Sequence, residues 1–326
     1  MALKQYPLDK TFLVAAWLES LVYGCFLVAF IMNVYIHLDS KRRQNTHSRV
    51  MFSFSIVMFI LATMHLAMNC YRMIRGYVEF RLAPGGPVGY IGTLSLWDHI
   101  FKDTLYATQS ILGDAAAVYR CWILWSRDYR IIIIPTIMLI VSTISGYMVC
   151  GLYSTIPPNA TVFDPRLTNW ITTFYSIAVA QNISTTFLMA WRLWLGEKNS
   201  ARYRMGSRGS LMPILRILVE SAALYLFVEI ILLSLYAVDY NAQYILLEVV
   251  TPIVGFTFSV ITIRINLRSQ GLTDSAPSSL VSGGTGVQTI GSLPMRPIVI
   301  ARRVEQFEDR HGDSEERFKN IIMAEA

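Results

Sequence analysis

The sequence predicts an all-α membrane protein, a bundle of seven transmembrane helices. The chain has 326 residues, of which 54% are apolar and only 15% are charged. A soluble domain usually carries about a quarter charged residues. The charges also gather between long apolar runs, each near the roughly 20 residues that a helix needs to cross a hydrocarbon core about 30 Å thick. This segregation favours lipid-facing helices joined by polar loops.

Seven segments are long enough to cross a bilayer, and six of them are strongly apolar. The predicted spans are 12–36, 50–71, 97–125, 131–152, 170–195, 213–238 and 244–263. They make up a transmembrane domain over residues 12–268. Residues 1–11 are predicted to be an extracellular N-terminus. Residues 269–326, which begin with a stretch rich in Gly, Ser, Thr and Pro, are predicted to be a cytosolic and largely disordered tail.

Segment 97–125 is the exception. It is less apolar than the other six, but its polar residues recur at helical spacing. At about 100° per residue, His99, Asp103, Tyr106, Ser110 and Asp114 fall within roughly an 80° arc of a helix. Such a stripe predicts a helix at the centre of the bundle, shielded from lipid by its neighbours. Without this helix the count would be six, and both termini would lie on the same side.

Loop charge predicts the orientation of the bundle. With the N-terminus outside, the inner segments carry thirteen lysines and arginines and the outer segments carry six. Basic residues accumulate on the cytosolic side of membrane proteins. We therefore expect the N-terminus outside and the C-terminus in the cytosol, with the plasma membrane as the location. Asn159 begins an Asn-Ala-Thr triplet in a predicted outer loop, where an N-glycan is expected.

Charged residues within spans are costly, and we expect them in two layers. An outer, acid-rich layer predicts a pocket that favours a cationic or protonatable ligand, or a proton path. The alternative interpretation is that these groups only tie helices together. The candidate ligand-binding residues are Glu19, His65, Asp103, Tyr106, Glu229 and Glu248.

The inner layer predicts a charge cluster that switches between two states. Its candidate residues are Asp114, Arg120, Arg216 and Glu220. The alternative is that the arginines only extend to lipid headgroups. Cys70 and Cys150 both fall near outer helix ends, so a disulfide between them is a further hypothesis. Gly255 belongs to a stripe of small and polar residues in 244–263 that favours tight helix packing.

The predicted arrangement resembles that of G-protein-coupled receptors, but the resemblance is architectural. The Val-Tyr-Arg-Cys-Trp run at 118–122 stands where rhodopsin-like receptors have Asp/Glu-Arg-Tyr, and 244–263 has no Asn-Pro-x-x-Tyr motif. This last span also has no lysine, which excludes a retinal Schiff base there. The runs 114–125 and 217–225 are more similar to a group of seven-helix membrane proteins of mushroom-forming fungi, over roughly residues 10–270. That resemblance implies the fold and no substrate.

The leading functional hypothesis is a receptor-like sensor of an extracellular small molecule, which signals to a cytosolic protein. A transporter or proton-coupled carrier is the first alternative, and a structural membrane protein without a ligand is another. A third is an intramembrane metal hydrolase using His65, His99 and Asp103. The sequence predicts no enzyme activity, no cofactor and no metal. Nucleic acid is not an expected partner, because the basic residues form short clusters between apolar runs; the expected partner is the lipid bilayer.

Overall fold

The computed structural model describes residues 6–39, 46–157, 162–201 and 212–274, and these residues form helices and connecting turns with no strand. Seven long helices carry the seven predicted segments, one on each. They are α1 (Leu8–Asp39), α2 (Thr46–Ile74), α4 (Trp97–Leu124), α5 (Tyr129–Tyr153), α6 (Pro165–Ala201), α7 (Met212–Ala237) and α8 (Gln243–Asp274). The first six residues of the predicted tail, 269–274, are helical and continue α8; the rest of that tail lies outside the described residues.

Five of these helices are long and apolar enough to cross a membrane, within the part of the chain that the structure describes. They are α1, α2 with its π-helical extension, α5, α7 from Val219, and α8 as far as Ile265. The prediction counted 170–195 among the strongly apolar segments, and this was wrong, because α6 is not one of the five. Gln181, Asn182 and Thr185 make α6 more polar, and all three are buried.

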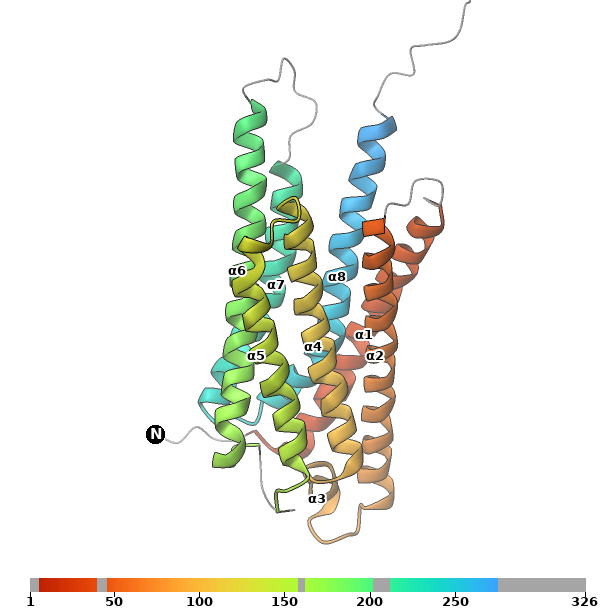
Figure 1. Cartoon of the computed structure of the whole chain (residues 1–326). Coiled ribbons are helices and arrows are strands. Elements are labelled where there is room, and N and C mark those ends of the chain that lie inside the picture. The colour runs from red at the N-terminus through yellow and green to blue at the C-terminus, as the bar shows by residue number, and fades with distance from the viewer. Residues whose placement is uncertain (1–5, 40–45, 158–161, 202–211, 275–326) are drawn as a thin grey trace, which may run out of the picture. The chain divides into compact units, whose positions relative to one another are not determined.

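The long helices lie side by side along one axis, with α4 between α2 and α5 (Figure 1). α4 packs against α2, α5, α6 and α8, and α8 packs against α1, α2 and α7 as well. Every residue of the predicted polar stripe on α4 is buried. The expectation that this helix lies at the centre of the bundle is therefore confirmed. Large apolar side chains such as Trp17, Ile134 and Phe227 are exposed instead, as lipid-facing surfaces require.

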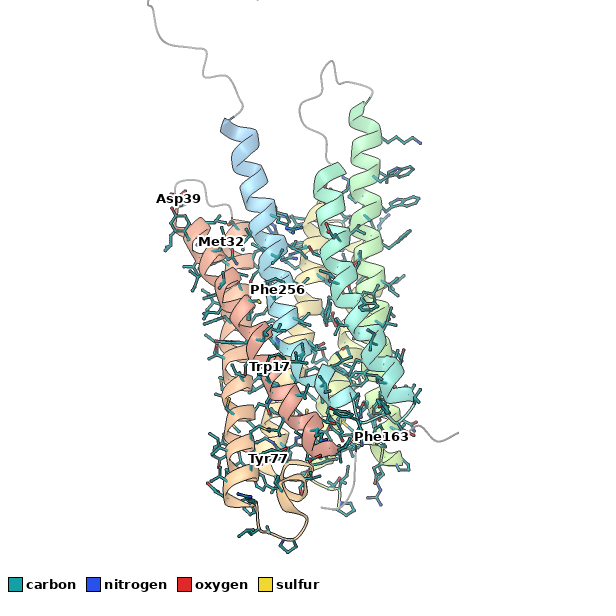
Figure 2. The ribbon with its side chains drawn as sticks, turned by 180° about the vertical axis from the view of Figure 1, so that it is seen from behind. Trp17, Met32, Asp39, Tyr77, Phe163 and Phe256 are labelled. Carbon is teal, nitrogen blue, oxygen red and sulfur yellow. The ribbon has the colours of Figure 1, made fainter. Side chains whose placement is uncertain are left out.

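The two ends of the bundle can be named by residues labelled in Figure 2: Asp39 lies at one end, and Tyr77 and Phe163 lie at the other. α1 begins at the Tyr77 end, where the Tyr77 hydroxyl donates to the Asp9 carbonyl at 2.6 Å. The π-helix η2 (Arg75–Glu79) and the short helix α3 (Gly86–Ile91), which the sequence did not predict, form the connection between α2 and α4 at this end (Figure 1).

Candidate functional site: buried charges and cavities of the bundle

A buried cluster joins α1 to α2 in the half of the bundle nearer the Tyr77 end. Glu19 Oε1 lies 2.7 Å from His65 Nδ1, and the Asn69 side-chain amide donates to Glu19 Oε2 at 2.5 Å. His65 and Asn69 are four residues apart, so they share one face of α2. All three side chains are buried. Each oxygen of the Glu19 carboxylate therefore has a partner on α2.

A lysine joins α4 to α8 beside this cluster. Lys102 Nζ donates to Glu248 Oε1 and lies 3.9 Å from Asp103 Oδ1. The other oxygen of Glu248 lies 3.6 Å from His65 Nε2, and His99 Nε2 lies 3.5 Å from Asp103 Oδ2. We call the connected set the outer ion network; its members are Glu19, His65, His99, Lys102, Asp103 and Glu248. It sets three carboxylates against a single ammonium group.

A second buried ion pair closes the Tyr77 end. Arg72 Nη1 lies 3.3 Å from Asp98 Oδ2, and Arg72 Nη2 donates to the Ile91 carbonyl at 2.5 Å. The Tyr90 hydroxyl donates to the same Asp98 oxygen at 2.9 Å. Partial burial and this contact with Asp98 raise the pKa of Tyr90 to about 12. The pair thus fixes the α2–α4 connection over the end of the bundle.

An aromatic cavity opens next to Asp103, between α4, α5, α6, α7 and α8. Its volume is about 40 Å³, where about 10–15 Å³ holds one water molecule. Its aromatic wall residues are Tyr106, Tyr153, Phe174, Tyr175, Tyr236 and Tyr244. Val162, next to the labelled Phe163, also lines it and places it near the Tyr77 end. Ring faces attract cations, and the Asp103 carboxylate in the wall adds a negative charge.

Two more cavities follow along the same side of α4. The middle cavity, about 10 Å³, is lined by Tyr106, Tyr175, Tyr225 and Glu229. Tyr106 and Tyr175 also line the aromatic cavity, so these two residues stand between the two spaces. The Asn182 amide donates to Glu229 Oε2 at 3.2 Å, which joins α6 to α7.

The inner cavity, about 70 Å³, lies in the half of the bundle nearer the Asp39 end and shares Tyr225 with the middle cavity. Asp114 and Arg120 both line it. Arg120 Nη2 donates to the Phe258 carbonyl at 3.2 Å and to Thr262 Oγ1 at 2.9 Å, and its guanidinium lies 4.1 Å from the centre of the Phe258 ring. Arg120 therefore holds α4 against α8.

The structure places the predicted ligand-binding residues in three overlapping sites, since Asp103 also belongs to the outer ion network and Tyr106 also lines the middle cavity. Asp103 and Tyr106 line the aromatic cavity. Glu229 lines the middle cavity. Glu19, His65 and Glu248 belong to the outer ion network, where they join α1, α2 and α8.

The predicted switch residues are also separated. Asp114 and Arg120 share the inner cavity, and no ion pair joins them among the described residues. Glu220 is exposed on α7, so it does not belong to a buried cluster with them. Arg216 lies on the same helix, but its side chain lies outside the described residues. Asn159, the predicted glycan acceptor, lies outside them as well.

The predicted disulfide is not formed, because Cys70 and Cys150 are both free thiols in the structure. Cys70 is exposed on α2, whereas Cys150 is buried and lines the aromatic cavity. α4 packs against both α2 and α5 and lies between them (Figure 1). The two sulfurs therefore do not face each other.

Sequence reasoning missed the aromatic wall and the central place of Lys102. The wall residues come from α4, α5, α6, α7 and α8, and each tyrosine alone reads as an ordinary residue of an amphipathic helix. The sequence did offer a signal for the role of Lys102: it stands one position before Asp103 in a predicted span, and a buried charge needs a partner. Its partner, Glu248, is 146 residues away in the chain.

Comparison with known proteins gives no match to a family model, a curated protein or a solved structure. The functional interpretation therefore depends on the helices, the ion network and the cavities. The helices that are long and apolar enough to cross a membrane make this chain a candidate multi-pass membrane protein.

Proposed function

We propose that the chain is a seven-helix, receptor-like protein of the plasma membrane that senses an extracellular small molecule. In this proposal α4 and α6 cross the bilayer beside the five apolar helices. Their lengths of 28 and 37 residues exceed the roughly 20 that a crossing needs. Asp98, Lys102, Asp103 and Asp114 of α4 and Gln181, Asn182 and Thr185 of α6 are buried in the bundle, which lowers the cost of placing these two helices in lipid. The positive-inside bias supports the Tyr77 end as the extracellular end.

The observation that carries the proposal is the aromatic cavity with Asp103 in its wall. It lies near the end at which α1 begins, so with the N-terminus outside it faces the extracellular side. Ligand pockets are mostly apolar and aromatic, with a few well-placed polar groups. This cavity has that composition, and its one carboxylate favours a cationic small molecule.

A screen for thermal stabilisation of the purified protein in detergent identifies such a ligand, because binding to the folded state raises the melting temperature. For a cationic hit, Asp103→Asn is expected to weaken binding roughly 10- to 100-fold, as for a lost hydrogen bond to a charged group. Glu79→Gln, on the exposed η2, is the charge-matched control and should leave affinity unchanged. Equal affinity of both variants would remove the cavity as the ligand site.

Receptor behaviour has a separate readout. Spin labels at Glu220 on α7 and Tyr129 at the start of α5, both exposed, report whether a bound ligand moves these helices relative to each other. A ligand-dependent change in their distance supports a receptor. A bound ligand with no change, together with uptake into liposomes, would favour a carrier.

A proton-coupled carrier is the second candidate, and the row of three cavities favours it. Each cavity has one carboxylate in its wall: Asp103, then Glu229, then Asp114. Carboxylates in series within a bundle are typical of proton relays. If this function holds, liposomes with a trapped pH dye will acidify in the presence of substrate, and Glu229→Gln will stop the acidification.

We also propose that the chain belongs with the seven-helix proteins of mushroom-forming fungi. The support is the run 114–125, which contributes Asp114 and Arg120 to the inner cavity. If the group shares this cavity, other members will carry an acid and an arginine at the same spacing.

A further inference from the structure

We propose that Glu19, His65 and Glu248 form a binding site for a divalent transition-metal ion such as zinc. One potential ligand atom from each residue can be chosen so that all lie within 4.8 Å of one another. The residues come from α1, α2 and α8: an ion bound to His65 and Glu248 would join α2 to α8, and Glu19 of α1 would hold His65 in place. The site is separate from the aromatic cavity, and it goes beyond the sequence prediction, which assigned no metal.

The spacing between His65 and Glu248 supports an ion between them. His65 Nε2 and Glu248 Oε2 lie 3.6 Å apart, whereas hydrogen bonds of this kind span about 2.7–3.2 Å. Zinc binds imidazole nitrogen and carboxylate oxygen at about 2.0–2.2 Å, and tetrahedral geometry then sets two ligand atoms roughly 3.3–3.5 Å apart. The observed separation is therefore closer to that of two ligands of one ion than to a direct contact.

Glu248 supplies the second, independent observation. Its side chain is 3% exposed, and its Oε2 atom has no hydrogen-bond partner among the described residues. The other oxygen accepts the hydrogen bond from Lys102. A buried carboxylate oxygen without a partner is costly and rare. An ion between Oε2 and His65 Nε2 would satisfy it without disturbing the contact with Lys102.

Glu19 acts as a positioning residue for His65. Its carboxylate holds His65 Nδ1 at 2.7 Å, and Asn69 holds its second oxygen. A histidine that ligates zinc commonly donates its other ring N–H to a carboxylate, which fixes the tautomer and the ring orientation. Here that arrangement leaves Nε2 facing Glu248. The network also has three carboxylates and one lysine, so a divalent cation improves its charge balance.

The test is a calorimetric titration of Zn²⁺ into the purified, chelator-treated full-length protein. We expect one ion per chain. His65→Gln and Glu248→Gln should weaken binding by about 100-fold or more, and Glu19→Gln by about 10- to 100-fold, as for other outer partners of zinc ligands. His47→Gln and Glu79→Gln remove a histidine at the start of α2 and an exposed carboxylate on η2, both outside the network, and are the matched controls. They should change the affinity no more than about threefold.

Equal binding by the His65 and Glu248 variants would show an adventitious ion only and overturn the proposal, as would no stoichiometric binding. If a variant fails to fold, a measurement on the unmodified protein still tests the site. X-ray absorption of the Zn²⁺-loaded protein should show nitrogen and oxygen ligands including imidazole, and a spectrum without imidazole would contradict the site. These tests use the metal alone, so they are independent of the proposed small-molecule function.

Discussion

Replacing Lys102 by methionine is expected to lower the free energy of unfolding by about 3–5 kcal/mol, the usual result of removing one partner from a buried ion pair. Methionine keeps much of the length and apolar character of the lysine stem, so the change mainly removes the charge. Glu248 would lose the donor to its Oε1 atom, and Asp103 would lose its nearest ammonium group. The measurement is denaturant unfolding of the purified protein in detergent micelles.

The control is Glu79→Gln, because Glu79 is exposed and pairs with Arg75 in an i, i+4 arrangement. Exposed pairs contribute little, and we expect no measurable change. The double variant Lys102→Met with Glu248→Gln should recover part of the loss, since it replaces a broken ion pair by neutral groups. A Lys102→Met variant as stable as the control would mean that the ammonium does not stabilise the outer ion network.

The second large effect is expected where Phe26 of α1 packs against Gly255 of α8. A β-carbon added at Gly255 would overlap Cζ of Phe26, a fully buried ring. Gly255→Ala should therefore cost about 1–3 kcal/mol through overpacking, and Phe26→Ala about 3–5 kcal/mol through the cavity it leaves. Removing the ring makes room for the added methyl group. The double variant should thus cost less than the sum, by about 0.5–3 kcal/mol.

Gly24→Ala on α1 is the control for the glycine change, because a β-carbon there meets nothing within 4 Å. Alanine is the better helix former, so this variant should be at least as stable as the parent. Strict additivity of the Phe26 and Gly255 variants would contradict the close contact between α1 and α8.

The helices were predictable because hydropathy and periodicity are local properties of the chain. The polar stripe on 97–125 even indicated that this helix would be buried, and His99, Asp103 and Asp114 are buried as expected. The short α3 was not predicted. It depends on Gly85 at a φ of 87° and on Pro87 in its first turn, a combination that reads from sequence as a plain turn.

The partners of the buried charges could not be predicted, because depth along a helix does not give the direction of a side chain relative to other helices. From the sequence, Glu248 and Glu229 were both predicted to belong to one outer, acid-rich layer. In the structure Glu248 pairs with Lys102 across α4 and α8, whereas Glu229 accepts from Asn182 of α6. Glu229 on α7 therefore faces α6 and Glu248 on α8 faces α4, which places them in different sites.

We propose that α4 and α6 cross the membrane with the five apolar helices, which makes seven crossings instead of five. Both counts place the two termini on opposite sides, so the test in intact cells adds to the two terminal epitope tags a third tag at Arg127, in the exposed turn between α4 and α5. With seven crossings, a membrane-impermeant antibody will reach the N-terminal tag at once, and it will reach the Arg127 tag and the C-terminal tag only after permeabilisation. Labelling of the Arg127 tag without permeabilisation, or equal labelling of the two terminal tags from one side, would contradict the seven-helix topology.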